Sequence, residues 1–262
     1  MAKAKAKVTD RLKEPVLGVD LGVSFTCAGL IMPTSGNKVS IVSHIEGAQQ
    51  IRSWVGISHT DDVSLGSGCR TWATWIYDSK YLVGKTYAEV VDFRSDLKYA
   101  VVKGKQNECM IKVHNGQVKP IQLILSRLFL AMKQIAEEEA KQIITKVVVG
   151  IPFKASNMHR IEMLEAAAIA GLDCIKLVED PVAAVIGSTL DDASSEYAKP
   201  PILKAGSHEW QMVIDINARH CAMTVLECVD EQPTVRSHIE SDLISGHVID
   251  ELLMEMFFRD FK

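Results

Sequence analysis

The stretch QMVIDINARHCAMTVLEC, residues 211–228, decides the fold because a polar turn interrupts two apolar runs in it. The first run ends near Asp215, the turn NARH follows at residues 217–220, and the second run begins at Cys221. Apolar runs of this length on both sides of a short turn predict a hairpin of two strands. Such a hairpin carries the carboxylate of Asp215 at its tip, beside an unusually bulky turn.

Residues 16–31, VLGVDLGVSFTCAGLI, repeat this layout, with Asp20 in the place of Asp215. A repeat of one supersecondary unit over this distance indicates two related lobes. An acid at each tip predicts that both tips face a shared cleft, where two carboxylates suit a hydrated magnesium ion that takes few direct protein ligands. Gly22 lets the backbone approach a phosphate, and Ser24 adds a hydroxyl donor. A plain hairpin turn explains the DLG spacing equally well.

The middle of the chain alternates between helical and strand patterns. Pro120 opens a long amphipathic helix whose apolar positions continue to Ile143. The continuous apolar run KVVVGIP then predicts a strand buried on both faces. A second helix, capped by Ser156 and ended by Gly171, precedes the strand CIKLV and the helix PVAAVIGSTL. This alternation predicts an α/β fold with parallel crossovers.

The first half of the chain is dominated by short strand patterns. A third strand within residues 38–47 completes an antiparallel meander with the first hairpin. Residues 61–116 are mixed: the Trp-rich stretch at 71–85 is compatible with a helix, and Asn115-Gly116 is a good hairpin turn. Near the other end, SGHVIDELLMEMFFRDFK has apolar residues on one helical face.

Composition and pattern together divide the chain into four parts. Residues 1–14 are expected to be a flexible basic tail, and residues 15–190 form a first lobe. Residues 191–208 are a polar connection that contains proline and glycine, and residues 209–262 begin a second, incomplete lobe.

The overall composition is that of an ordinary globular protein, because 47% of the 262 residues are hydrophobic, 24% are charged and the net charge is −4. This balance gives no reason to expect a nucleic acid or a membrane surface as partner, so a pocket is the better place to look for function. There is neither an export signal nor an apolar span, and the histidines lack metal-ligand spacing. The cysteines contain no CxxC pair and favour a reducing, cytoplasmic compartment: Cys27, Cys69, Cys109, Cys174, Cys221 and Cys228.

With these residues placed, the chain resembles the nucleotide-binding domain of the 70-kDa heat-shock chaperones, from about residue 16 to residue 262. The resemblance implies the actin-like ATPase (ribonuclease H-like) fold of the actin and sugar-kinase superfamily, an α/β fold of mixed sheets with flanking helices. Here it covers the first lobe and the start of the second. Six segments carry it in the family's order: GVDLGVSFT, DSKYLVGK, IPFKASNMHR followed by IAGL, VEDPVAAV, IDINARHCAMTVLE and SGHVIDELL.

The resemblance also implies roles for individual residues around ATP or ADP. Asp20 and Asp215 would hold Mg²⁺ through water, and Gly22, Val23 and Ser24 would contact phosphate. Lys80 would orient the attacking water and steady charge on the transferring phosphoryl group, so the implied catalytic residues are Lys80, Asp180 and Asp215. Asp180 stands in the place of a family glutamate, and its shorter side chain reaches less far. Without the resemblance, Lys80 is an ordinary surface lysine and Asp180 an ordinary residue before proline.

The second phosphate loop departs from the family. Asn217, Ala218, Arg219 and His220 stand where the family has three glycines and a threonine, so side chains fill the space where backbone should approach phosphate. Arg219 still offers positive charge to a phosphate. In the first loop, Val23 replaces a hydrogen-bonding threonine. Hydrolysis by the family's mechanism is therefore expected to be slow or absent.

Three functions remain open at this point. The first is the ATP-binding domain of a divergent chaperone in protein folding and stress response, with a J-domain co-chaperone and a nucleotide-exchange factor as partners. Unfolded polypeptide would bind only through a domain absent from this sequence, which makes the chain a fragment or a reduced relative. The second is a non-catalytic regulatory or scaffold subunit, for example at ribosomes with a J-domain partner. A sugar kinase fits the IPF, IAGL and EDPVAA segments less well.

Overall fold

The first hairpin lies at the centre of the main sheet. The computed structural model describes residues 12–35, 38–43, 48–90, 92–93, 97–188 and 206–261. The main sheet of this part of the chain consists of β1 (Val16–Leu21), β2 (Phe25–Ile31), β3 (Val39–Ile41), β4 (Gln50–Arg52), β11 (Lys146–Ile151) and β12 (Asp173–Glu179). The strand order is β12-β11-β1-β2-β3, and β4 also pairs with β2.

The pairing directions follow the sequence prediction. β1 runs antiparallel to β2, and β2 runs antiparallel to β3, as the meander predicts. β11 lies parallel to both β1 and β12, which confirms the parallel crossovers. The predicted end of the third strand, residues 44–47, lies outside the described residues.

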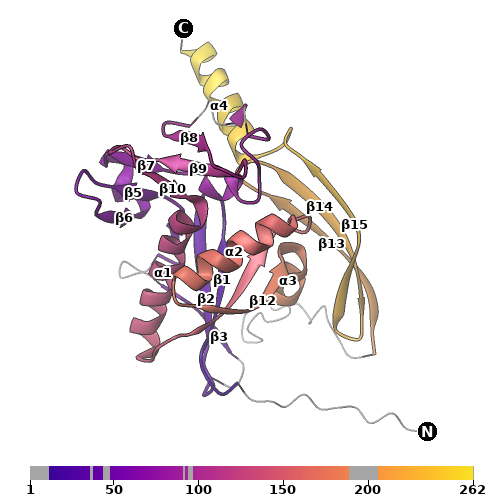
Figure 1. Cartoon of the computed structure of the whole chain (residues 1–262). Coiled ribbons are helices and arrows are strands. Elements are labelled where there is room, and N and C mark those ends of the chain that lie inside the picture. Colours follow the sequence, from indigo (N-terminus) through magenta and orange to yellow (C-terminus); the bar gives the residue numbers. More distant parts are fainter. Residues whose placement is uncertain are drawn as a thin grey trace.

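Two helices cover one face of this sheet and close the main core (Figure 1). They are α1 (Ile121–Ala140) and α2 (Asn157–Ile169), which pack against each other and against the sheet. Ser156 caps α2 by accepting a hydrogen bond from the His159 amide at 3.1 Å, and Gly171 follows its end with a φ of 72°, as predicted. The prediction that α1 reaches Ile143 is wrong. Lys141 turns into the left-handed region at φ 52°, and Ile143 is 78% exposed.

Residues 55–120 build two small sheets beside the main one. They contain β5 (Val55–Ile57), β6 (Val63–Leu65), β7 (Thr74–Ile76), β8 (Ala100–Lys103), β9 (Cys109–Lys112) and β10 (Val118–Pro120), with the 3-10 helices η1 (Gly66–Thr71) and η2 (Ser79–Leu82). The hairpin turn at Asn115-Gly116 is confirmed, with Gly116 at φ 84°. The Trp-rich stretch is not one helix. Its centre is β7, where Trp75 packs against Trp54 and Tyr77, and Asp78 at φ 54° separates β7 from η2.

The opening stretch forms the predicted hairpin of a third small sheet. Its strands are β13 (His208–Ile216), β14 (Cys221–Val229) and β15 (Gln232–Ser241). α3 (Asp180–Ser188) joins this sheet to the first lobe through a small second core of Val185, Leu226 and Cys228. The predicted tail and connection fall largely on residues 1–11 and 189–205, outside the described residues.

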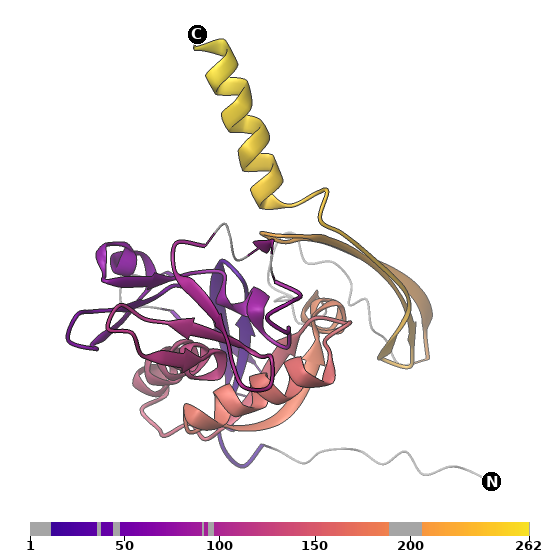
Figure 2. The same cartoon turned by 45° about the horizontal axis from the view of Figure 1, so that its top comes forward.

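The last helix, α4 (Gly246–Asp260), extends away from the rest of the molecule (Figure 2). None of its residues is buried, so the predicted apolar face of this helix is exposed to solvent. No helix in the described ranges has the length and apolar character needed to cross a membrane.

Candidate functional site

The tips of the two hairpins line one cleft of about 520 Å³. The turn after β1 forms one wall and the turn after β13 forms the opposite wall, as the sequence repeat suggested. The segment before η2 and the first turn of α4 also border the cleft. The lining residues that matter below are Asp20, Gly22, Asp78, Asn217, Arg219 and His247.

The first turn is a tight, glycine-dependent loop. The Gly22 amide donates to the Phe25 carbonyl at 2.9 Å, and a Cβ on Gly22 would lie only 2.5 Å from that same oxygen. Beneath the turn, the buried Ser53 hydroxyl donates to the Gly22 carbonyl at 2.7 Å. The Ser53 and Thr26 hydroxyls also share a hydrogen bond of 2.9 Å. This support holds the Val23 and Ser24 backbone at the edge of the cleft.

The second turn is built without glycine. The Asn217 amide donates to the His220 carbonyl at 2.8 Å, and none of the four residues from 217 to 220 has a positive φ. Side chains therefore fit this turn without backbone strain. Two backbone carbonyls of this turn accept hydrogen bonds from the start of α4. The Gly246 amide donates to the Asn217 carbonyl at 2.9 Å, and the His247 amide donates to the Ala218 carbonyl at 3.0 Å. The start of α4 thus holds the turn in place.

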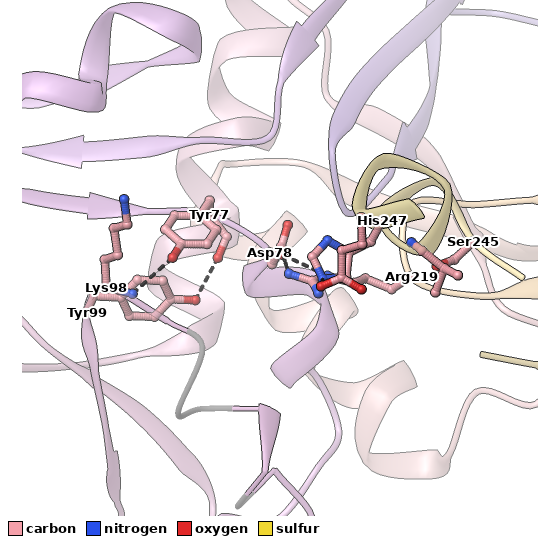
Figure 3. A network of polar contacts seen from close by, with 9 residues as sticks. Tyr77, Asp78, Lys98, Tyr99, Arg219, Ser245 and His247 are labelled. Atoms are coloured by element: carbon pink, nitrogen blue, oxygen red, sulfur yellow. Dashed lines mark hydrogen bonds and ion pairs between the residues drawn. The ribbon is translucent and has the colours of Figure 1, made fainter. Parts of the chain in front are cut away.

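Two side chains of the second turn bind acids of this protein rather than pointing into open space. The Asn217 side-chain amide donates to the Asp215 carboxylate at 2.7 Å. The Arg219 guanidinium reaches across to Asp78 and donates to Oδ2 from Nε at 3.0 Å and from Nη2 at 2.6 Å (Figure 3). Arg219 also lies over the Phe93 ring, with Cζ 5.3 Å from its centre. The large side chains of Asn217 and Arg219 in this turn therefore form hydrogen bonds within the protein.

A group of carboxylates lies where the strands of the main sheet end. The pKa of Asp180 is raised to about 6, chiefly by burial: the positive charge of Lys80 lowers the pKa, and the negative charges of Asp20 and Asp215 raise it. Gly150 on β11 makes room for this arrangement, since a Cβ there would lie 2.9 Å from Asp180 Oδ1. Asp20, Lys80 and Asp215 are therefore each within electrostatic reach of Asp180.

Lys80 stands in η2 beside a buried histidine. His159 is 8% exposed, and burial lowers its pKa to about 4, with the positive charge of Lys80 acting in the same direction. Its Nε2 has no hydrogen-bond partner in the described part of the chain. His159 is therefore neutral at physiological pH, so it adds no second charge next to Lys80.

The predicted site residues fall into two groups. Those that line the cleft are Asp20, Gly22, Val23, Ser24, Asn217 and Arg219. Lys80, Asp180, Asp215 and His220 do not line it in the described structure, although the first three are linked electrostatically as above. The sequence reasoning missed Asp78, which stands two positions before Lys80 in the DSKYLVGK segment. Its partner Arg219 is 141 positions away, so spacing gave no signal for the pair.

The carboxylates fit a hydrated magnesium ion better than a directly chelated metal. The negative charges of Asp20 and Asp215 both act on Asp180. No group of three His, Cys, Asp or Glu side chains among the described residues is close enough to chelate a metal. Magnesium retains several waters and takes few direct protein ligands, so Asp20 and Asp215 could hold it through water.

A comparison with known families agrees with this arrangement. The family described as Hsp70 protein matches residues 16–262, which is nearly the whole chain. The mixed sheets and flanking helices belong to the actin-like ATPase fold of that family, which confirms the predicted fold class. The chain therefore belongs to the Hsp70 family, and the matched residues correspond to a chaperone nucleotide-binding domain.

Proposed function

We propose that this domain binds ATP or ADP with Mg²⁺ in the cleft between the two hairpins but hydrolyses ATP slowly or not at all. The observation that carries the proposal is the contrast between an intact first turn and a second turn whose side chains are bound internally. Glycine-rich turns present amides to phosphate, whereas a turn filled by side chains keeps the phosphate at a distance.

The residues of the first lobe retain the means to bind a nucleotide. Asp20 and Asp215 would hold Mg²⁺ through water, and the ion would neutralise charge on the phosphates. The backbone of Val23 and Ser24 would donate to phosphate oxygens at the cleft edge. Lys80 would supply positive charge beside the attacking water, with the neutral His159 next to it.

Two features of the second lobe support slow hydrolysis. Asn217 holds the Asp215 carboxylate at 2.7 Å and so competes with a metal-bound water for it. Arg219 is engaged by Asp78, and no threonine hydroxyl is present at position 220. Removing one preorganised donor from a charged transition state typically lowers kcat by about 10²–10³-fold.

Calorimetric titration with Mg-ATP, together with a single-turnover hydrolysis assay on the whole chain, tests the proposal. We expect measurable binding and turnover that is barely above the uncatalysed rate. The same two assays on Lys80→Ala serve as the control for mechanism. Robust turnover that survives Lys80→Ala would sink the roles given to these residues.

Restoring the family's second loop provides a companion test. A variant with glycine at positions 217–219 and threonine at 220 should bind Mg-ATP more tightly than the original chain, because backbone amides could then approach the phosphates. A variant with alanine at positions 217, 219 and 220 removes the same side chains without giving glycine's freedom. If the glycine variant binds no better than the alanine variant, the missing backbone freedom of this loop does not limit affinity.

A non-catalytic role is the second candidate, and the occupied second turn favours it. Hsp70 family domains generally work with J-domain co-chaperones and exchange factors. We propose that this chain binds the same kinds of partner. It would do so either while assisting protein folding under stress or as part of a scaffold such as a ribosome-bound subunit.

The described cysteines are free, which supports a reducing compartment such as the cytoplasm. A pull-down with a J-domain protein, with and without Mg-ATP, distinguishes the chaperone role from the scaffold role. Capture of the J-domain protein that does not depend on nucleotide supports the scaffold role.

A further inference from the structure

Arg219 and Asp78, which both line the cleft, form an ion pair between the second turn and the segment before η2. Their side chains are only 18% and 12% exposed. Two nitrogens of Arg219 donate to the same carboxylate oxygen, at 3.0 and 2.6 Å. Charge-assisted bonds of this kind are about twice as strong as neutral hydrogen bonds.

Each partner is held in place by its own surroundings. Asp78 follows β7 in a left-handed conformation that few residue types other than glycine, asparagine and aspartate adopt readily. The buried Tyr99 hydroxyl donates at 2.7 Å to the carbonyl of the preceding Tyr77, which fixes the backbone there (Figure 3). On the other side, the amide of His247 fixes the Ala218 carbonyl, and Phe93 lies under the Arg219 guanidinium. Surrounding contacts therefore hold both partners of this ion pair in position.

The carboxylate of Asp78 offers Arg219 the same chemistry as a phosphate group. A guanidinium binds carboxylate and phosphate oxygens through the same fork of donors. A phosphate that enters this cleft also meets the negative charge of Asp78 itself. Asp78 occupies the Nε and Nη2 edge of the guanidinium, so a phosphate that binds this edge must first displace Asp78.

We propose that Asp78 is an internal anion that occupies Arg219 and thereby sets the affinity of the cleft for polyphosphate ligands. Asp78 is then a specificity-determining residue, and Arg219 is a phosphate-binding residue held in reserve. Without a ligand, the pair holds the second hairpin against the first lobe. A polyphosphate competes with Asp78 for the guanidinium and loosens this contact. The inference deepens the proposed function and rests on it only for the identity of the natural ligand.

Titration of the whole chain with inorganic tripolyphosphate tests the competition directly. Asp78→Asn should bind it at least about tenfold more tightly than the original chain, because one charge-assisted contact becomes available. Asp250→Asn is the matched control, since Asp250 lines the same cleft and its loss removes the same charge without freeing an arginine. We expect a gain of about twofold from the control. In an Arg219→Gly background, Asp78→Asn should give no more than the control gain.

Two results would overturn the inference. The first is an equal gain from Asp78→Asn and Asp250→Asn, and the second is a tenfold gain from Asp78→Asn that persists without Arg219. Either result would mean that Asp78 only repels anions at a distance. Circular dichroism checks that each variant is folded.

A measurement on the unsubstituted chain keeps the inference testable if Asp78→Asn does not fold. The NMR signal of the Arg219 Nε–H group, assigned by its absence from Arg219→Lys, should shift as tripolyphosphate is added. A signal that stays unchanged at saturation contradicts the competition.

Parallel titrations with Mg-ATP separate this inference from the proposed function. If tripolyphosphate behaves as expected and no variant binds Mg-ATP, the nucleotide proposal fails and the role of Asp78 stands. If the original chain and Asp78→Asn bind Mg-ATP and tripolyphosphate equally well, nucleotide binding stands and the role of Asp78 fails.

Discussion

The two walls of the cleft have the same topology but opposite construction. On the first wall, a glycine turn is supported from below by buried hydroxyls, so that backbone faces the cleft. On the second wall, the turn contains no glycine, and its side chains bind Asp215 and Asp78. The two copies of the repeat therefore share a hairpin but differ in the groups that face the cleft. Strand pairing determines the hairpin, whereas the turn residues determine whether backbone or side chains face the cleft.

The largest expected effect lies in the first lobe, beside Lys80, and depends on pH. Burial and the charge of Lys80 lower the pKa of His159 from 6.5 to about 4. Between these two values the unfolded chain binds more protons than the folded chain. The stability that the neutral His159 contributes is thus fully present above pH 6.5 and is lost as the pH falls towards 4, by about 3 kcal/mol.

Urea unfolding of the original chain and of His159→Gln at several pH values measures this loss. The difference in unfolding free energy between the two proteins should change across pH 6.5 to 4, in favour of His159→Gln at the acidic end. A difference that is constant with pH would show that His159 is not held neutral next to Lys80.

The second prediction compares glycine-dependent and glycine-free turns directly. Gly22→Ala should destabilise the fold by about 2–3 kcal/mol, because the new Cβ would lie 2.5 Å from a backbone oxygen that cannot move aside easily. Ala218→Gly is the matched change in the second turn and should cost less than about 1 kcal/mol, since no positive φ is required there. Denaturant unfolding of both variants gives the comparison, and similar costs would mean that the two turns are equally constrained.

The sequence predicted elements that depend on local signals better than features that depend on contacts between distant residues. Alternation of apolar strands, the Ser156 cap and Gly171 are local signals, and the structure has the corresponding hairpins, helix and crossovers. The end of α1 was missed because Ile143 keeps the helical spacing although Lys141 has already left the helix. The Trp-rich stretch was ambiguous because its strand is fixed by ring packing with Trp54, which is distant in sequence.

Contacts between distant side chains explain what was missed at the site. The repeat placed Asp20 and Asp215 in equivalent positions, because each is the last residue but one in the first strand of a hairpin. Nothing in the spacing of residues linked Arg219 to Asp78, which lies between β7 and η2 in the first lobe. The sequence indicates only that Arg219 offers positive charge to a phosphate, and the structure shows that it binds the carboxylate of Asp78.

The third prediction concerns the ion pair that joins the walls. Arg219→Ala should destabilise the chain by about 2 kcal/mol, because it leaves the Asp78 carboxylate, which is only 12% exposed, without its counter-ion. Arg236→Ala breaks an ion pair whose arginine is 53% exposed, and it should cost clearly less. Thermal unfolding in buffers of low and high salt distinguishes them. Equal losses from the two variants would indicate that the Arg219 pair behaves as a surface contact.

The smallest expected effect concerns the way α4 supports the second wall. The Ser245 hydroxyl caps α4 by accepting from the Val248 amide at 3.3 Å, and removing such a cap typically costs about 1 kcal/mol. The amides of Gly246 and His247 hold the Asn217 and Ala218 carbonyls, so fraying of α4 should loosen the second turn as well.

Amide hydrogen exchange of Ser245→Ala should therefore accelerate in residues 216–221 as well as in the first turn of α4, while residues 20–26 remain unchanged. Ser156→Ala removes the corresponding cap of α2, which lies against the first lobe, and should leave residues 216–221 unaffected. Faster exchange confined to α4 would mean that the second turn holds its shape through Arg219 and Asn217 alone. In that case the difference between the two walls would lie entirely in their side chains.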